Sequence, residues 1–233
     1  MAFASTISTT STTSFSMWLK TTTTSNQYIL TYLPSAPNGI LFRNGKIYFF
    51  DIPAINATSY PQSNDISSTL ADGNWHHLVV TRDNKNVKFY LDKNDVSTST
   101  TFNLDFNSFD ITHFGKASSN HGIDWNGEVS NLAIFNSVLS QANVETLYNN
   151  GQPQDNISFT PTHWWKLNSI NGTTVTDTNG SNNGTTSGSI ETTDVKTSDL
   201  NIPVNGVSTT LPSTALQQSD LQFDSPYSNY SLS

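Results

Sequence analysis

The sequence predicts an all-β protein, a sandwich or jelly roll of antiparallel sheets with one short helix. Three observations predict it. Aromatic residues make up 11% of the 233 residues and charged residues only 12%, whereas disordered chains are usually rich in charge and poor in aromatics. Much of the remainder is Ser, Thr and Asn; Thr with aromatics favours strands, and Asn with Gly favours turns. Short strand-like runs recur along the chain, and only one segment has a helical pattern.

The strands expected in the first part of the chain are separated by polar turns. Residues 1–14 are rich in Ser and Thr, and we expect an extended arm or an edge strand there. The clearest hairpin joins residues 40–43 and 46–50, because Asn44-Gly45 suits the two positive φ angles of a tight primed turn. The other early strands are expected at 15–20 and 27–32.

A second hairpin is expected over residues 75–92. Its turn is DNKN, and its second strand, VKFYLD, has the period-two alternation of a half-buried strand. The helix candidate is 140–148, where Ser140 can cap the start and Gly151 lies just past the end. Further strands are expected near 100–106, 111–116 and 128–136.

Charge and composition exclude several classes of partner. The formal net charge is −8 with only 10 Lys and Arg, so we expect neither nucleic acid nor an anionic membrane surface as a partner. The absence of cysteine excludes disulfides and thiolate metal sites. No apolar run is long enough for membrane insertion, and the N-terminus lacks the pattern of a Sec-type signal peptide. We therefore expect synthesis in a cytoplasm, with any extracellular role reached by lysis or another route.

Three stretches resemble laminin-G-like, concanavalin A-like domains. GNWHHLVVTRDNKNVKFYLD resembles the central hairpin of that family, and GEVSNLAIFNSVLSQANVETLYNNG resembles its closing strand and helix. FSMWLK resembles an earlier strand, and the three stretches occur in the family's order over residues 15–151. The resemblance implies a concanavalin A-like jelly-roll sandwich of two antiparallel sheets with one short helix.

The C-terminal segment, residues 152–233, resembles the beginning of such a domain. HWWKLNSINGTTVTDTNGSNNG is similar to the family's opening strand and loop, and LQFDSPYSNYSLS is similar to the strand expected just before residue 1. We therefore expect a circularly permuted chain with an arm at 1–14, a core at 15–151 and a completing segment at 152–233. That segment completes its own sandwich or, by strand exchange, that of a neighbour. A third alternative is a loosely packed appendage.

Catalytic residues are sparse. A glycosidase needs two carboxylates flanking the scissile bond, and none of Glu128, Glu145 and Glu191 lies in an acidic cluster on a strand. His76 and His77 are adjacent, so on one strand they point to opposite faces and cannot chelate one metal ion. We expect a protein without enzymatic activity.

One loop is a candidate for carbohydrate binding. Sugar binding needs an exposed aromatic platform with hydrogen-bonding groups beside it. Trp125 is flanked by Asp124 and Asn126, and His121 lies in the same loop. The alternative is that Trp125 packs on the edge of the sandwich.

A second loop is a candidate for calcium. DTNGSNNG supplies oxygen atoms from Asp177, Asn179 and Asn183, and calcium prefers such ligands. The loop has no second carboxylate, and the alternative is a tight polar loop without an ion. Calcium is the one cofactor that the sequence suggests.

The favoured function is that of a non-enzymatic protein on the surface of a virion. The fold resembles modules of phage capsid decorations and fibres, and the acidic, Ser/Thr/Asn-rich chain fits that setting. We expect a homo-oligomer that contacts capsid or tail proteins, with host or environmental glycans as candidate ligands. The alternative is an extracellular carbohydrate-binding module of a bacterial surface or secreted protein.

Overall fold

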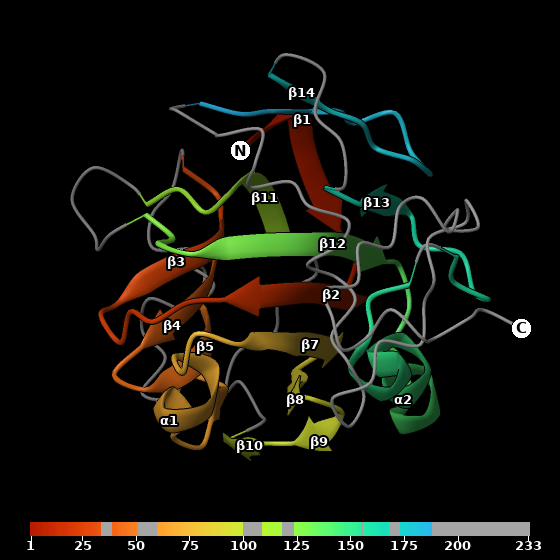
Figure 1. The fold of residues 1–233 in the computed structure, drawn as a ribbon. Coiled ribbons are helices and arrows are strands. Elements are labelled where there is room, and N and C mark those ends of the chain that lie inside the picture. The colour runs from red at the N-terminus through yellow and green to blue at the C-terminus, as the bar shows by residue number, and fades with distance from the viewer. Residues whose placement is uncertain are drawn as a thin grey trace, which may run out of the picture.

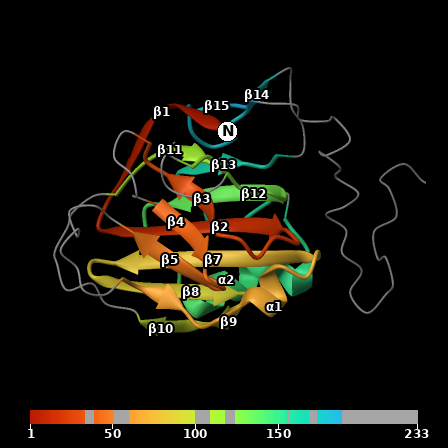
Figure 2. The ribbon, with the colours of Figure 1, turned by 90° about the vertical axis from the view of Figure 1, so that its left-hand side faces the viewer.

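A computed structural model describes residues 1–33, 39–50, 60–99, 109–117, 124–154, 156–167 and 173–187. Its strands form two antiparallel sheets stacked in two layers (Figures 1 and 2). The predicted two-sheet jelly-roll sandwich is therefore confirmed. No helix in these ranges is long and apolar enough to cross a membrane.

The first sheet has six strands, and side chains alternate between its two faces. In β2, Phe15, Met17 and Leu19 point into the sandwich, while Ser16 and Trp18 lie on the outer face. The strand order is β13-β12-β2-β7-β8-β9. The bounds are β2 Thr12–Lys20, β7 Trp75–Asp83, β8 Asn86–Leu91, β9 Asn94–Asp95, β12 Glu128–Phe135 and β13 His163–Trp165.

The second sheet has nine strands and contains the predicted Asn-Gly hairpin. Asn44 and Gly45 have φ angles of 50° and 78°, as a primed turn requires. The strand order is β10-β6-β5-β4-β3-β11-β1-β15-β14. The bounds are β1 Ala2–Thr9, β3 Gln27–Thr31, β4 Gly39–Arg43, β5 Lys46–Phe50, β6 Gln62–Ser63, β10 Ser97–Ser99, β11 Phe109–Phe114, β14 Thr174–Val175 and β15 Gly184–Thr185. The strand expected at 100–106 lies entirely outside the described residues.

The main core fills the space between the sheets. Aromatic side chains from both sheets are fully buried there, among them Phe15, Phe42, Phe49, Phe89 and Trp165. Burying one such side chain contributes about 1.5–3 kcal/mol relative to its exposure. The aromatic content of the sequence is thus used mainly to hold the two sheets together.

A helix covers the outer face of the six-stranded sheet. Helix α2, Gln141–Tyr148, begins at Ser140, whose side chain accepts a hydrogen bond from the backbone of Asn143. Its buried residues Val144 and Leu147 pack against a second cluster on that face. The predicted helix and its cap are therefore confirmed. The structure also has a single helical turn, α1 Ser67–Leu70, and a 3-10 turn, Asn149–Gly151.

The described part of the C-terminal segment pairs with its own chain. β13 extends the six-stranded sheet by pairing with β12, and β15 pairs with β1 while β14 pairs with β15. Figures 1 and 2 both show the N-terminus beside β14 and β15. β13, β14 and β15 thus extend the two sheets within the same chain. The C-terminal strand expected in LQFDSPYSNYSLS lies outside the described residues.

This pairing changes the place expected for residues 1–14. They were expected to form an arm or an edge strand, but β1 lies between β11 and β15 in the interior of the sheet. The reason is that β15 and β14 cover the side of β1 that would otherwise be free.

Candidate functional site

Trp125 precedes β12 in the chain and is only partly exposed. Its ring packs against the main core, and its Nε1 is buried without a hydrogen-bond partner among the described residues. Its backbone N–H donates to the Gly115 carbonyl, 3.0 Å away. The ring thus packs against the core, and a role of Trp125 in sugar binding stays a prediction.

The polar residues flanking Trp125 have different settings. Asp124 is exposed and accepts hydrogen bonds from Lys116 Nζ at 2.8 Å and from the Ala117 backbone at 2.9 Å. These contacts keep the pKa of Asp124 below its ordinary value although its partial burial acts in the opposite direction. The backbone N–H of Asn126 donates to Gln27 Oε1. His121 lies outside the described residues, so its role stays a prediction.

The loop proposed for calcium uses its oxygens within the protein. The buried Asp177 carboxylate accepts from His163 Nδ1 at 2.6 Å and from the backbone of Trp164, Gly180 and Asn182 at 2.9–3.1 Å. These bonds hold the pKa of Asp177 below its ordinary value, although desolvation acts to raise it.

The two asparagines of the loop are also engaged. Asn183 Oδ1 accepts from the backbone N–H of Asp177, and Asn179 Nδ2 donates to the Pro161 carbonyl. No cluster of three or more His, Cys, Asp or Glu suited to a metal ion occurs in the part of the chain that the structure describes. A calcium ion at this loop stays a prediction, and it would have to replace several of the N–H donors.

His76 and His77 occupy opposite faces of β7, as expected from their adjacency. His76 lies between two carboxylates, with Nδ1 2.6 Å from Asp92 Oδ2 and Nε2 3.0 Å from Asp72 Oδ1. Desolvation lowers the His76 pKa, but the hydrogen bonds and charges of the two aspartates outweigh it and raise the pKa overall. His77 is fully buried, and desolvation lowers its pKa to about 3.

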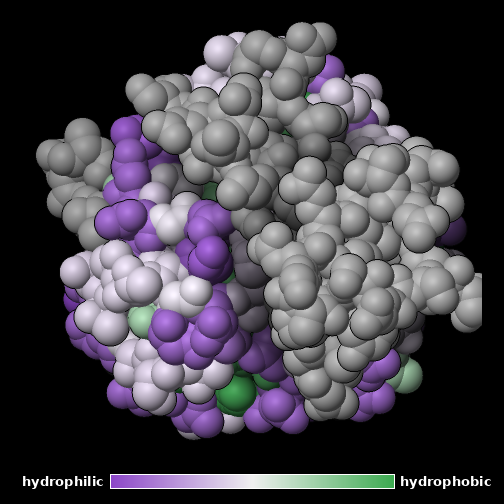
Figure 3. Space-filling view, viewed as in Figure 1, coloured by the Kyte–Doolittle hydropathy of each residue, from purple (hydrophilic) through white to green (hydrophobic). Residues whose placement is uncertain are grey.

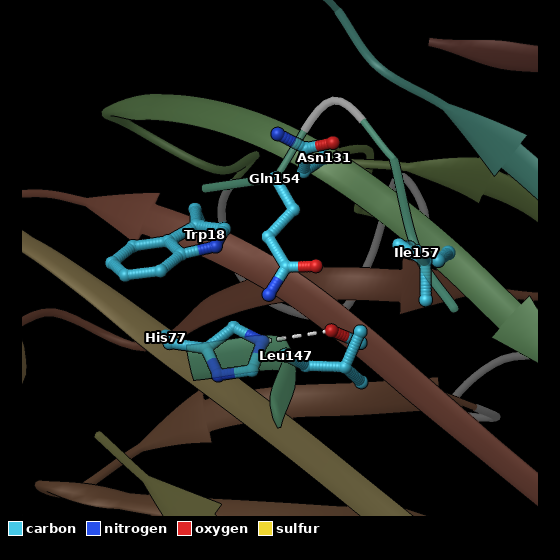
Figure 4. Close-up of a pocket in the computed structure, with 8 residues that line it drawn as sticks. Trp18, His77, Asn131, Leu147, Gln154 and Ile157 are labelled. Carbon is cyan, nitrogen blue, oxygen red and sulfur yellow. Dashed lines mark hydrogen bonds between the residues drawn. The ribbon is translucent and has the colours of Figure 1, made fainter. Parts of the chain in front are cut away.

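His77 lines a small pocket on the outer face of the six-stranded sheet (Figure 4). Figure 4 shows Trp18 and His77 on one side and Ile157 on the other, with the Gln154 side chain reaching between them. The space has a volume of about 240 Å³, open solvent included. Gln154 Nε2 donates to the Thr146 carbonyl.

The polar pair in this pocket does not form a complete hydrolytic triad. His77 Nε2 lies 2.8 Å from Ser16 Oγ, the arrangement of a base beside a nucleophile. The other ring nitrogen, Nδ1, has no hydrogen-bond partner among the described residues, and Asp92 contacts the His77 backbone instead. A triad needs a carboxylate at that nitrogen to orient the imidazole and to stabilise its charged form.

A third surface, which the sequence analysis did not single out, lies on the outer face of the nine-stranded sheet. Tyr48 and Phe50 of β5 are partly exposed and point away from the core, since Ile47 and Phe49, which alternate with them along the strand, are fully buried. The Phe50 ring lies 5.5 Å from the Tyr48 ring and 4.3 Å from the Tyr60 ring, centroid to centroid. We call Tyr48, Phe50 and Tyr60 the aromatic row.

The aromatic row has an amide residue beside it and a small hydrophobic cluster beneath it. The strand register places Tyr48 opposite Leu41 on one side and Gln62 on the other. Phe50 also packs on the small cluster of Tyr28, Leu41 and Ala117 beneath it. The rings are therefore held in place by the sheet and its outer cluster, with an amide side chain alongside.

The signal for this surface was present in the sequence. In KIYFF, aromatic residues occupy the positions that would be polar in an ordinary half-buried strand. What the sequence could not supply is the ring of Tyr60, which reaches Phe50 from beyond a segment that lies outside the described residues.

On the side of the molecule that Figure 3 shows, the coloured surface is mostly hydrophilic or neutral. Val138 is the one large apolar side chain classed as exposed within the described ranges. Within the described ranges, partly exposed aromatic residues therefore contribute apolar surface that a ligand could contact.

These features define the class of the protein as a lectin-like β-sandwich. The chain belongs to the Concanavalin A-like lectin/glucanases superfamily, whose family model matches residues 1–145. The match confirms the resemblance found in the sequence. Comparison with curated proteins gives no match.

Comparison with solved structures gives matches at low sequence identity. A Bacteroides ovatus ATCC 8483 protein that is proposed to bind carbohydrate superposes with a TM-score of 0.58 at 13% identity, over 80% of this chain. This chain spans 57% of the length of that protein. Domain 4 of an extracellular arabinanase from Geobacillus stearothermophilus, in complex with arabinotriose, gives 0.38 at 19% identity, over 60% of this chain and 67% of that one. Mouse laminin α1 domains LG4-5 give a TM-score of 0.37 at 17% sequence identity, over 57% of this chain and 38% of that one.

Proposed function

We propose that this protein binds carbohydrate without cleaving it and that the aromatic row takes part in binding. The observation that carries the proposal is the set of three neighbouring, partly exposed rings, with Tyr48 and Phe50 on strand β5 and Tyr60 just before β6. Sugar rings present apolar C–H faces that stack on aromatic rings, and their hydroxyls need nearby amide or charged groups. Gln62 supplies such an amide beside Tyr48. Membership of a lectin-type superfamily and the likeness in fold to the Bacteroides ovatus protein agree with the proposal.

The absence of cleavage is part of the proposal. Glycoside hydrolysis uses a pair of carboxyl groups roughly 5–9.5 Å apart. Glu128 forms an ion pair of 2.8 Å with Lys20, and Glu145 lies on α2 beside Gln141. The Ser16–His77 pair lacks the third member of a triad among the described residues. We expect polysaccharides incubated with the protein to yield no new reducing ends, and an activity lost on Glu128→Gln would contradict this.

Replacing Phe50 tests the proposed surface. We expect Phe50→Ala to weaken glycan binding about tenfold or more, because a ligand covering this ring would contribute about 1.5 kcal/mol or more through burial. The measurement is isothermal titration with oligosaccharides selected on a glycan array.

The matched control is Phe159→Ala, because Phe159 is a partly buried phenylalanine packed against Phe135 on the opposite sheet. Equal binding by the Phe50 and Phe159 variants and the wild type would exclude the aromatic row. Loss of binding in Trp125→Ala instead would move the site to the loop that contains Asp124 and Asn126.

The placement of this module on a virion, its contacts with capsid or tail proteins and its homo-oligomeric state stay predictions from the sequence. A symmetric oligomer that co-sediments with phage particles would support them. A monomer that binds glycans without particles would favour the alternative, a carbohydrate-binding module of a bacterial surface or secreted protein.

A further inference from the structure

The aromatic row has a pair of cations beside it. Arg43 at the end of β4 and Lys46 at the start of β5 pair directly across the strands. They have the same side-chain direction as Leu41 and Tyr48, since side chains two residues apart on a strand share a face. They therefore lie on the outer face of the nine-stranded sheet, about 7 Å along the strands from the Leu41–Tyr48 pair.

No ion pair within the described ranges joins Arg43 or Lys46 to a carboxylate. The ion pairs found there involve Lys20, Lys88 and Lys116, but neither Arg43 nor Lys46. The nearby acid is the exposed Asp65, whose carboxylate lies against Gly45 in the turn between the two cations. Hydrogen bonds from Ser67 favour its negative form first, and the charge of Lys46 adds to them. Arg43 is also near Tyr28, where its charge opposes the effect of burial on the Tyr28 pKa.

Two adjacent cations without an ion-pair partner are unusual on a chain of net charge −8 with 10 basic residues. Electrostatic complementarity makes this pair of cations attractive to an anion. The Arg guanidinium can engage a carboxylate or sulfate with two parallel N–H groups, whereas Lys acts as a point charge.

We propose that the outer face of the nine-stranded sheet binds acidic glycans, whose sugar rings stack on the aromatic row while their carboxylate or sulfate groups meet Arg43 and Lys46. This inference rests on the proposed function and narrows its ligand class. In this arrangement the aromatic rings provide a general affinity for sugars, and the two cations select acidic sugars.

The experiment compares two acidic probes with neutral partners of the same backbone. Oligogalacturonate is paired with its methyl ester, and dextran sulfate with dextran. Binding of the full chain to each is measured at low and high salt. We expect each acidic probe that binds to have an affinity about tenfold or more above that of its neutral partner. This difference in affinity should shrink as salt screens the charges. A carboxylate preference and a sulfate preference appear separately in the two arms.

The variants separate the cations from the rings. We expect Arg43→Gln and Lys46→Gln each to weaken binding of the acidic probe about fivefold and to leave the neutral partner unchanged. We expect Phe50→Ala to weaken binding of both the acidic probe and its neutral partner. The control is Lys116→Gln, which removes an exposed cation beside Asp124 near Trp125 and is expected to leave binding unchanged.

Each outcome decides between the two proposals. Equal, salt-insensitive binding of acidic and neutral probes, or a loss confined to Lys116→Gln, overturns the inference about Arg43 and Lys46. If a neutral probe still binds and this binding falls in Phe50→Ala, the proposed function stands without the acidic preference. Failure of all four probes to bind counts against both.

Discussion

At the scale of single residues, His76 has the most unusual environment. Both of its ring nitrogens lie within 3.0 Å of an aspartate oxygen, from Asp92 and Asp72. Both ring nitrogens can donate hydrogen bonds at the same time only when the imidazole is protonated. His76 therefore links the turn after β8 to the loop before β7 in its charged form.

This setting predicts a stability that depends on pH. The folded pKa of His76 is raised above the ordinary value of 6.5, so its stabilising contribution is complete below pH 6.5 and is lost as the pH rises through the folded pKa. We expect His76→Gln to reduce the free energy of unfolding by about 1.5–3 kcal/mol at pH 5.5 and by less at pH 9. Urea unfolding of both proteins at the two pH values gives the comparison, in which other titrating groups cancel. A difference that grows with pH would show that the charged form is not the one that stabilises.

At the scale of elements, the loop between β14 and β15 is organised around Asp177. The carboxylate accepts hydrogen bonds from three backbone N–H groups and from His163. Trp165 Nε1 donates a hydrogen bond to the Asn182 carbonyl in the same loop. These contacts secure β13 to the loop. The Asn/Gly-rich sequence that resembled a metal loop thus has a structural role that needs no ion.

The hydrogen bonds of Asp177 predict how the loop responds to substitution and to calcium. We expect Asp177→Asn to lower the free energy of unfolding by about 1–3 kcal/mol, because buried N–H donors lose their acceptor. We expect the unfolding temperature of the wild type to be the same in millimolar calcium and in chelator, because the Asp177 carboxylate and Asn183 Oδ1 already accept hydrogen bonds within the protein. A calcium-dependent rise that Asp177→Asn abolishes would instead establish the metal site suggested by the sequence.

The elements that could be predicted from the sequence are those with local signals. The 40–50 hairpin follows from Asn44-Gly45, and α2 follows from Ser140 and the spacing of Val144 and Leu147. The sheet position of β1 could not be predicted, because it depends on pairing with residues more than 170 positions away. The aromatic row escaped notice for a similar reason, since Tyr60 meets Phe50 only in the folded chain. Burial of Trp125 likewise depends on the packing of distant strands.

At the scale of the whole molecule, the ends of the described chain close both sheets. Trp165 is fully buried, with its ring 4.7 Å from Phe3 of β1, and Trp164 of the same strand packs in the cluster under α2. One short strand thus contributes to the packing on both faces of the six-stranded sheet. The strand of three residues is consequently more important for stability than its length indicates.

Truncation tests whether this closure is intramolecular. We expect a chain that ends at Gln152 to unfold or aggregate, because losing a buried Trp or Phe costs about 3–5 kcal/mol and a domain has only about 5–15 kcal/mol in all. The control ends at Ser187 and keeps β13, β14 and β15, so it should fold like the full chain. Circular dichroism reports folding, and light scattering reports the mass. If the chain ending at Gln152 were instead a soluble, folded monomer while the full chain formed a discrete oligomer, the C-terminal segment would complete a neighbour's sandwich by strand exchange.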